Sequence, residues 1–250
     1  WGFDASQYYP PMLSAWSKIK LGWVTPTLLT APGTYSARQG CDYPDIFKIT
    51  SNFPPGEYLL IENRQKCNFD AMIRGPGLAI FHIDESANLN TEGYPGQANW
   101  PTNAQHYRVA LLQADGNYNL EKGNNRGDET DLFFSPLVTG ISSSGTSAGL
   151  AFPNTNAYQG GNVSNTGISI TSISSSSSIM TFDVGLFGVS PPTPAPTLPQ
   201  ANKLRVKLTT DSYPEETAWT LYQVSPIISL IASKATSSYQ PNTANDEILY

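Results

Sequence analysis

Turns built from proline and glycine divide this chain into short apolar segments, and they constrain its fold more than any other feature. Such tripeptides stand at residues 31–33, 54–56 and 75–77. Proline presets its own φ and glycine accepts positive φ, so each tripeptide predicts a turn. The segments with strand character are residues 24–30, 46–50, 57–63, 78–84 and 107–113. We therefore predict a mainly β protein with an irregular, sandwich-like β region.

Residues 12–23 have helical character instead. The apolar side chains that recur there at helical spacing are Met12, Trp16, Ile19 and Trp23. Lys18 and Lys20 fall off that face, and Gly22 is a stop signal. The pattern predicts one short amphipathic helix that ends near Gly22.

The β pattern continues from residue 140 to residue 188. Residues 168–173 and 179–187 have strand character, and the serine run 174–178 between them predicts a hairpin tip. Residues 142–149 are also rich in serine, but they lack the Gly-x-Ser-x-Gly motif of a nucleophilic serine. We predict a loop there.

A proline-rich segment at residues 190–199 marks a domain boundary, because it supports neither a ladder nor a helix and is typical of an extended linker. Beyond it, residues 203–209 and 217–224 have strand character. Residues 200–250 are too few for a full sandwich, so they predict a truncated second β domain.

The charge of the chain excludes some classes of partner. Charged residues make up 14% of the sequence, and the formal net charge is −6. Without a stripe of Lys and Arg to release counterions, nucleic acid is not an expected partner. No apolar run approaches the roughly 18 residues that span a bilayer, so no membrane span is expected. Low charge with abundant Gly, Pro, Ser and Asn suits a β-rich extracellular protein.

Two further features favour secretion. Cys41 and Cys67 are the only cysteines, and an even pair predicts one disulfide. Two buried thiols in a reducing compartment are the alternative. Asn162 opens an Asn-x-Ser sequon and is a predicted glycosylation site. The chain starts at Trp1 without a signal peptide, so we expect it to be the middle of a longer polypeptide.

Residues 77–85 place His82 and two carboxylates at the end of an apolar strand. On a strand, His82 and Asp84 point to the same face. They suit a metal-ligand pair or a histidine oriented by a carboxylate, but we favour a buried histidine satisfied by its neighbours. His106 is the one other histidine and lies too far away in sequence for a His-Glu-x-x-His zinc helix.

The segment 115–131 is rich in oxygen-bearing side chains, which are the ligands that calcium prefers. The side chains that alternate at its start, as in a calcium loop, are Asp115, Asn117 and Asn119. An EF-hand would place glycine at Leu120 and glutamate at Arg126, so the segment is not one, and an ordinary polar loop is the alternative. The predicted calcium ligands are Asp115, Asp128 and Asp131.

Aromatic residues raise the further possibility of a carbohydrate-binding surface. Trp100, in a polar loop, and Trp219 are the candidates for a platform on which a sugar stacks. Packing in the core is the competing explanation for these residues.

Several blocks of the sequence resemble one known family. The blocks are WGFD at 1–4, LSAWSK at 13–18, LGW at 21–23, GEYLLIENR at 56–64, GLAIFHIDE at 77–85 and GDETDLF at 127–133. In this order they look like the immune inhibitor A family of secreted zinc metallopeptidases. The resemblance covers residues 1–188 and leaves the tail beyond the proline-rich segment unexplained.

The resemblance implies that this chain is the downstream part of a zinc endopeptidase whose zinc-binding helix lies upstream. Residues 1–23 would then end the catalytic subdomain, and residues 24–189 would form the β-rich part that supports it, with bound calcium. In the intact protein a zinc-polarised water, with a glutamate as general base, would attack a peptide bond of a protein substrate.

No zinc ligand or catalytic residue carries over to this chain, so we expect it to be inactive alone. A pseudopeptidase without zinc stays open. The alternative from another class is a non-enzymatic extracellular module that binds calcium or carbohydrate.

Overall fold

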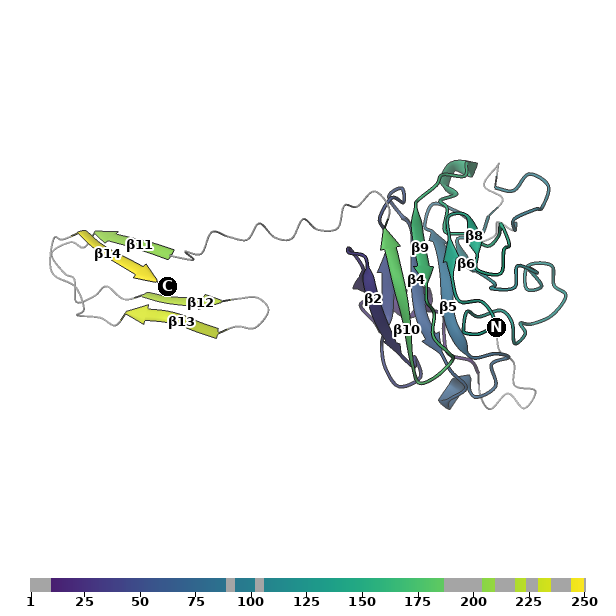
Figure 1. The fold of residues 1–250 in the computed structure, drawn as a ribbon, viewed down its shortest axis with the longest axis horizontal. Helices are drawn as coiled ribbons and strands as arrows, with labels where there is room; N and C mark the ends of the chain where they lie inside the picture. Colours follow the sequence, from purple (N-terminus) through teal and green to yellow (C-terminus); the bar gives the residue numbers. More distant parts are fainter. Residues whose placement is uncertain are drawn as a thin grey trace. The chain divides into compact units, whose positions relative to one another are not determined.

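The computed structural model describes residues 10–88, 93–101 and 106–186, and the backbone of four strands between residues 204 and 249. The chain divides into two compact units, Trp1–Pro192 and Thr193–Tyr250 (Figure 1). The division falls inside the predicted linker 190–199, which itself lies outside the described residues.

Two five-stranded sheets form the first unit (Figure 1). The first sheet has the order β1 (Thr27–Leu28), β3 (Ile46–Ile49), β4 (Glu57–Arg64), β5 (Gly77–Asp84) and β6 (Val109–Leu111). The second has the order β2 (Gly33–Arg38), β10 (Ile179–Leu186), β9 (Ile168–Thr171), β7 (Ile141–Ser142) and β8 (Gly145–Thr146). Neighbours are antiparallel except β1 and β3, which are parallel. The predicted mainly β fold is confirmed.

The central strands β4 and β5 are buried along their whole length. Alternate residues point to opposite faces of a strand, so each strand fills two cores. The β4 and β5 residues that face the second sheet include Leu59, Ile61, Leu78 and Ile80. Those on the outer face include Tyr58, Leu60, Phe81 and Ile83. This double burial explains why the middle of each strand, residues 58–61 and 78–81, is a continuous apolar run.

The strands that the sequence analysis missed are short or polar. β2 pairs with β10 over six residues, yet only Ala37 of β2 is fully buried. Its sequence therefore carries little hydrophobic signal. β7 and β8 form a small hairpin within the serine-rich segment predicted as a loop. β9 and β10 pair antiparallel on either side of the serine run 174–178, as predicted.

The one α-helix among the described residues, α1 (Ala15–Lys20), is shorter than predicted. It begins after Ser14, whose Oγ accepts a hydrogen bond from the Ser17 N–H at 3.3 Å. It ends before Gly22, whose φ of +72° favours glycine. Ala15, Trp16 and Ile19 pack against the outer face of the first sheet. Trp23, predicted on the apolar face, is instead 66% exposed because the helix has already ended.

Lys18 corrects a second expectation about this helix. Its side chain, predicted to lie off the buried face, is buried and forms an ion pair with Glu62 of β4 at 2.6 Å. Arg64 extends the network to Glu62 at 3.0 Å and to Asp70 at 2.7 Å. Asp70 ends the short 3₁₀ helix η1 (Asn68–Asp70). A buried ionic network therefore fastens the helix to the sheet.

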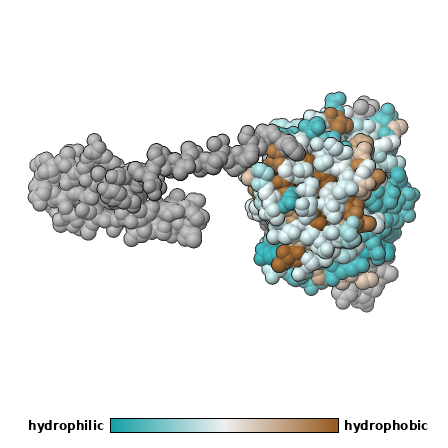
Figure 2. Space-filling view, viewed as in Figure 1, coloured by the Kyte–Doolittle hydropathy of each residue, from teal (hydrophilic) through white to brown (hydrophobic). Residues whose placement is uncertain are grey.

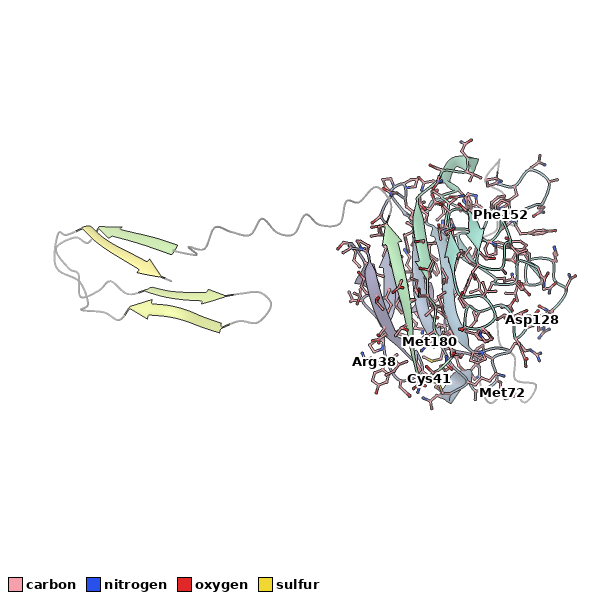
Figure 3. The ribbon with its side chains drawn as sticks, in the orientation of Figure 1. Arg38, Cys41, Met72, Asp128, Phe152 and Met180 are labelled. Atoms are coloured by element: carbon pink, nitrogen blue, oxygen red, sulfur yellow. A yellow bond between two sulfur atoms is a disulfide. The ribbon has the colours of Figure 1, made fainter. Side chains whose placement is uncertain are left out.

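Cys41 and Cys67 form the predicted disulfide, with 6.2 Å between their Cα atoms. The bond joins the turn after β2 to the residue before η1, near one end of the sandwich, where Figure 3 labels Cys41. The alternative of two buried thiols is wrong.

The second unit contains four strands in two antiparallel pairs. β11 (Leu204–Thr209) pairs with β14 (Ala244–Leu249), and β12 (Trp219–Gln223) pairs with β13 (Ser229–Lys234). Two of the four correspond to the predicted strands 203–209 and 217–224. In the described part of this unit, these two strands pair with later segments instead of with each other.

The surface agrees with the low charge of the sequence. On the face of the first unit seen in Figure 2, hydrophobic patches are separated by neutral and hydrophilic residues. Within the described residues, no helix has the length and hydropathy that a membrane crossing requires.

Candidate functional site

His82 lies at the end of β5, buried between the sheets, with 1% of its surface exposed. Its Nε2 is 2.8 Å from Glu57 Oε1, a carboxylate oxygen at the start of β4. The register of the two strands places His82 opposite Leu59 and Glu57 opposite Asp84. The histidine is therefore satisfied by a neighbouring strand, as the favoured interpretation predicted.

Asp84 shares a face with His82 but pairs with the other histidine. His106 Nε2 is 2.8 Å from Asp84 Oδ2, and Gln159 donates to Asp84 Oδ1 at 3.2 Å. Burial alone would raise the pKa of Asp84, but hydrogen bonds from Ser86, His106 and Gln159 outweigh burial and lower the pKa. Sequence analysis did not reveal this second pair, because His106 is 22 residues away from Asp84 along the chain.

The two carboxylates also fasten a loop from the second sheet. Tyr158 and Gln159, where the 3₁₀ turn η3 (Gln159–Gly161) begins, donate their backbone N–H groups to the Glu57 carboxylate. The Tyr158 ring centroid is 4.7 Å from that of His82 and 6.2 Å from that of His106. These contacts fit a structural clamp, since the Glu57 and Asp84 carboxylates both bind groups of the loop that contains Tyr158 and Gln159.

The predicted calcium ligands converge at a different place. One carboxylate oxygen from each of Asp115, Asp128 and Asp131 lies within 4.8 Å of the others. Asp131 is fully buried, whereas the other two are half-buried. Figure 3 labels Asp128 among the loops outside the sheets. Across the described ranges, this is the single group of three or more His, Cys, Asp or Glu side chains with metal-binding geometry.

Local hydrogen bonds orient the three carboxylates. Thr130 Oγ1 lies 2.7 Å from Asp115 Oδ2 and 2.6 Å from Asp128 Oδ1. A hydroxyl has one proton and can donate it to only one of them. Asp131 Oδ2 accepts the Asp128 N–H at 2.7 Å, and Asn125 donates to Asp128 Oδ2 at 2.9 Å. The carboxylates are therefore held together despite their like charge.

This arrangement concentrates negative charge. Two unit charges at such separations repel by about 3 kcal/mol at an effective dielectric constant of about 20, before screening by solvent. The hydrogen bond from Thr130 lowers the pKa of Asp128, which keeps its carboxylate ionised. Nearby, burial and the charge of Asp131 raise the pKa of Glu121, although a hydrogen bond from Gln113 opposes them. A bound divalent cation would relieve the repulsion, and the all-oxygen ligand set suits Ca²⁺ or Mg²⁺.

The residues predicted to bind carbohydrate or to be glycosylated lie apart from the aspartate triad where the structure describes them. Trp100 is half-buried and packs edge-on against Tyr158 and Phe152, with ring centroids 4.7 and 5.4 Å apart, so it is not a free sugar-stacking platform. The side chain of Trp219 lies outside the described residues. Asn162 is exposed in the segment after η3, and its glycosylation stays a prediction.

Comparison of the sequence with protein-family models gave no match, and comparisons with curated proteins and with solved structures gave none either. Inference about function therefore rests on the residues, their geometry and the resemblance of the sequence blocks.

Proposed function

We propose that this chain is a calcium-binding, non-catalytic β-sandwich module of a secreted protein. The observation that carries the proposal is the convergence of Asp115, Asp128 and Asp131. Bound calcium would supply positive charge that joins the two ends of the 115–131 loop. Asp131 anchors one side, because it is buried and its backbone C=O accepts a hydrogen bond from Ala114 beside Asp115.

The test is a thermal unfolding titration of the full chain after treatment with EGTA. Extracellular calcium modules bind with Kd values of about 0.1–1 mM. At a calcium concentration of about 100 Kd, the free energy of unfolding should rise by about 2.7 kcal/mol. For a unit of this size, that corresponds to a rise in Tm of roughly 5–10 °C. Mg²⁺ at the same concentration should raise Tm less, because Mg²⁺ demands near-ideal octahedral geometry and loses its bound water reluctantly.

Two variants make the test specific. Asp128→Asn should abolish the calcium-dependent rise, because it removes one ligand charge. Glu129→Gln is the matched control, since this exposed neighbour lies outside the triad. An unchanged Tm with calcium, or an equal loss in both variants, would refute the calcium site.

We also propose that the module belongs to a zinc endopeptidase of the immune inhibitor A type, acting on protein substrates. What supports this is the packing of the resembling blocks into one unit. Trp16 of α1 donates to Glu85 at 3.0 Å, so the blocks at 13–18 and 77–85 are in contact.

Zinc itself does not fit the described residues. His82 and His106 are each hydrogen-bonded to a different carboxylate, and neither belongs to the one candidate metal group. The peptidase proposal therefore needs zinc ligands from elsewhere in the parent protein. Its test is the encoding sequence upstream of Trp1: a His-Glu-x-x-His helix there supports the proposal, and an upstream region without both histidines contradicts it.

A further inference from the structure

A small cavity lies beside the clamped loop and is separate from the aspartate triad. Its volume is about 30 Å³. A water needs about 10–15 Å³ by this measure, so the cavity holds a molecule of two or three heavy atoms. Its lining includes Tyr94, Trp100, His106, Tyr118, Glu121 and Tyr158. None of the described residues that line it is a lysine or an arginine.

Two buried polar atoms in the lining have no hydrogen-bond partner within the described part of the chain. They are Tyr118 Oη and His106 Nδ1, on side chains that are 7% and 4% exposed. His106 Nε2 faces the Asp84 carboxylate, and in the tautomer that carries its proton on Nε2 the Nδ1 atom is an acceptor. Buried polar groups normally have a partner. Tyr118 Oη can accept as well as donate, so both atoms can accept hydrogen bonds from a ligand that brings donors.

The other lining groups are electron-rich as well. Tyr94 and Tyr118 are stacked with ring centroids 5.6 Å apart, and Trp100 meets Tyr158 edge-on. Aromatic faces attract cations. The aromatic cluster already contacts one ammonium group, because Lys122 Nζ lies 5.2 Å from the Tyr94 ring centroid. Glu121 adds a carboxyl group to the wall, and a cation bound beside that group would favour its ionised form.

We propose that this cavity binds a small primary ammonium group, the head of an alkylamine. Such a group carries a positive charge for Glu121 and the ring faces, together with N–H donors for Tyr118 Oη and His106 Nδ1. The size of the cavity admits methylammonium, which has two heavy atoms, and excludes a quaternary ammonium ion. This inference does not depend on the calcium site or on the peptidase proposal.

The test is an NMR titration of the full chain with methylammonium chloride, observed at the indole N–H of Trp100. Very small ligands gain little free energy, so the expected Kd is about 10 mM. Three controls separate the contributions at equal concentration. Sodium chloride tests ionic strength, methanol has the same size without the charge, and tetramethylammonium has the charge but is too large. Saturable shifts with methylammonium alone are expected, and shifts that do not saturate or that methanol reproduces would overturn the proposal.

Variants localise the binding. Glu121→Gln should weaken methylammonium binding about tenfold, because it removes the charge and keeps the shape. Tyr118→Phe should weaken binding several-fold without disturbing the fold, since its hydroxyl has no protein partner among the described residues. Glu129→Gln removes an exposed carboxylate outside the cavity and should bind normally. Equal binding by Glu121→Gln and the unaltered chain would overturn the proposal.

The bound ammonium group could belong to a free amine or to a lysine side chain of another polypeptide. Titrations with n-butylammonium and Nα-acetyl-lysinamide distinguish these two sources. Binding of both, each weakened by Glu121→Gln, would identify a lysine side chain of another polypeptide as a ligand. Binding of the free amines alone would identify small amines. Failure of all the primary amines to bind would overturn the proposal.

Discussion

The substitution Lys18→Met tests whether a buried ion pair holds α1 against the first sheet. Lys18 is 5% exposed and Glu62 is fully buried, and their charged atoms are 2.6 Å apart. Methionine is unbranched, is one heavy atom shorter than lysine, and removes the charge. Because the pair is shielded from water, its loss should destabilise the protein far more than loss of a surface pair, which is worth about 0–1 kcal/mol.

The expected loss in the free energy of unfolding depends on which buried charge each substitution leaves without a partner. Removing one partner of a buried pair costs about 3–5 kcal/mol. Lys18→Met should lie at or below the lower end, about 2–3 kcal/mol, because Arg64 remains 3.0 Å from Glu62 and still neutralises it. Glu62→Gln should cost about 3–5 kcal/mol, because it leaves the Lys18 ammonium buried without a carboxylate. The double variant should be less destabilised than the sum of the two, since neither charge is then left alone.

The assay is urea unfolding of the four proteins of this double-mutant cycle. Lys20→Met is the control, because Lys20 pairs with Glu85 but its side chain is 49% exposed, and its loss should cost at most about 1 kcal/mol. The reasoning would be refuted if Lys18→Met cost no more than this control. Additive effects, within about 0.5 kcal/mol, would equally show that the two residues do not act as a pair.

Three other outcomes follow from the fold. Because the pKa of Asp84 is lowered in the folded state, ionised Asp84 stabilises the protein above the ordinary carboxyl pKa of about 3.9. This stabilisation is lost as the pH falls through the folded-state pKa of Asp84. Asp84→Asn should therefore flatten the dependence of the unfolding free energy on pH below about 4. Replacing both Cys41 and Cys67 by Ser should cost about 3.5 kcal/mol in urea unfolding, as expected for a sequence separation of 26. Phe182→Ala, at a fully buried ring between the sheets, should cost about 3–5 kcal/mol in the same assay, and a cost under about 1 kcal/mol would contradict the assigned core.

The strands most accessible to sequence analysis are those whose side chains fill the core. The middle residues of β4 and β5 are apolar on both faces, and both strands were predicted to within a residue of their bounds. β2 was missed because its ladder with β10 depends on backbone hydrogen bonds, which any residue provides. The burial of Lys18 was missed for a related reason: its helical position predicted an exposed charge, and only a carboxylate on β4 makes burial favourable.

The aspartate triad could be predicted from a local sequence pattern, whereas the clamp formed by Glu57, Asp84 and their partners could not. Asp115, Asp128 and Asp131 lie within one short segment, so their shared chemistry is visible in the sequence. The clamp joins Glu57 to Tyr158, 101 residues away, and Asp84 to His106 across the edge of the sheet. Partners of this kind depend on strand order and register, which no local pattern specifies.

The contrast between these carboxylates is itself an argument for a cation at the triad. The buried Glu57, Glu62 and Asp84 each take a histidine, lysine or arginine partner. Asp115 and Asp128 take hydrogen bonds from neutral groups of their own loop and lie against a third carboxylate. Because Asp115 and Asp128 lie half-buried beside the buried Asp131, while Glu57, Glu62 and Asp84 have basic partners, the triad is suited to a positive charge that comes from solution.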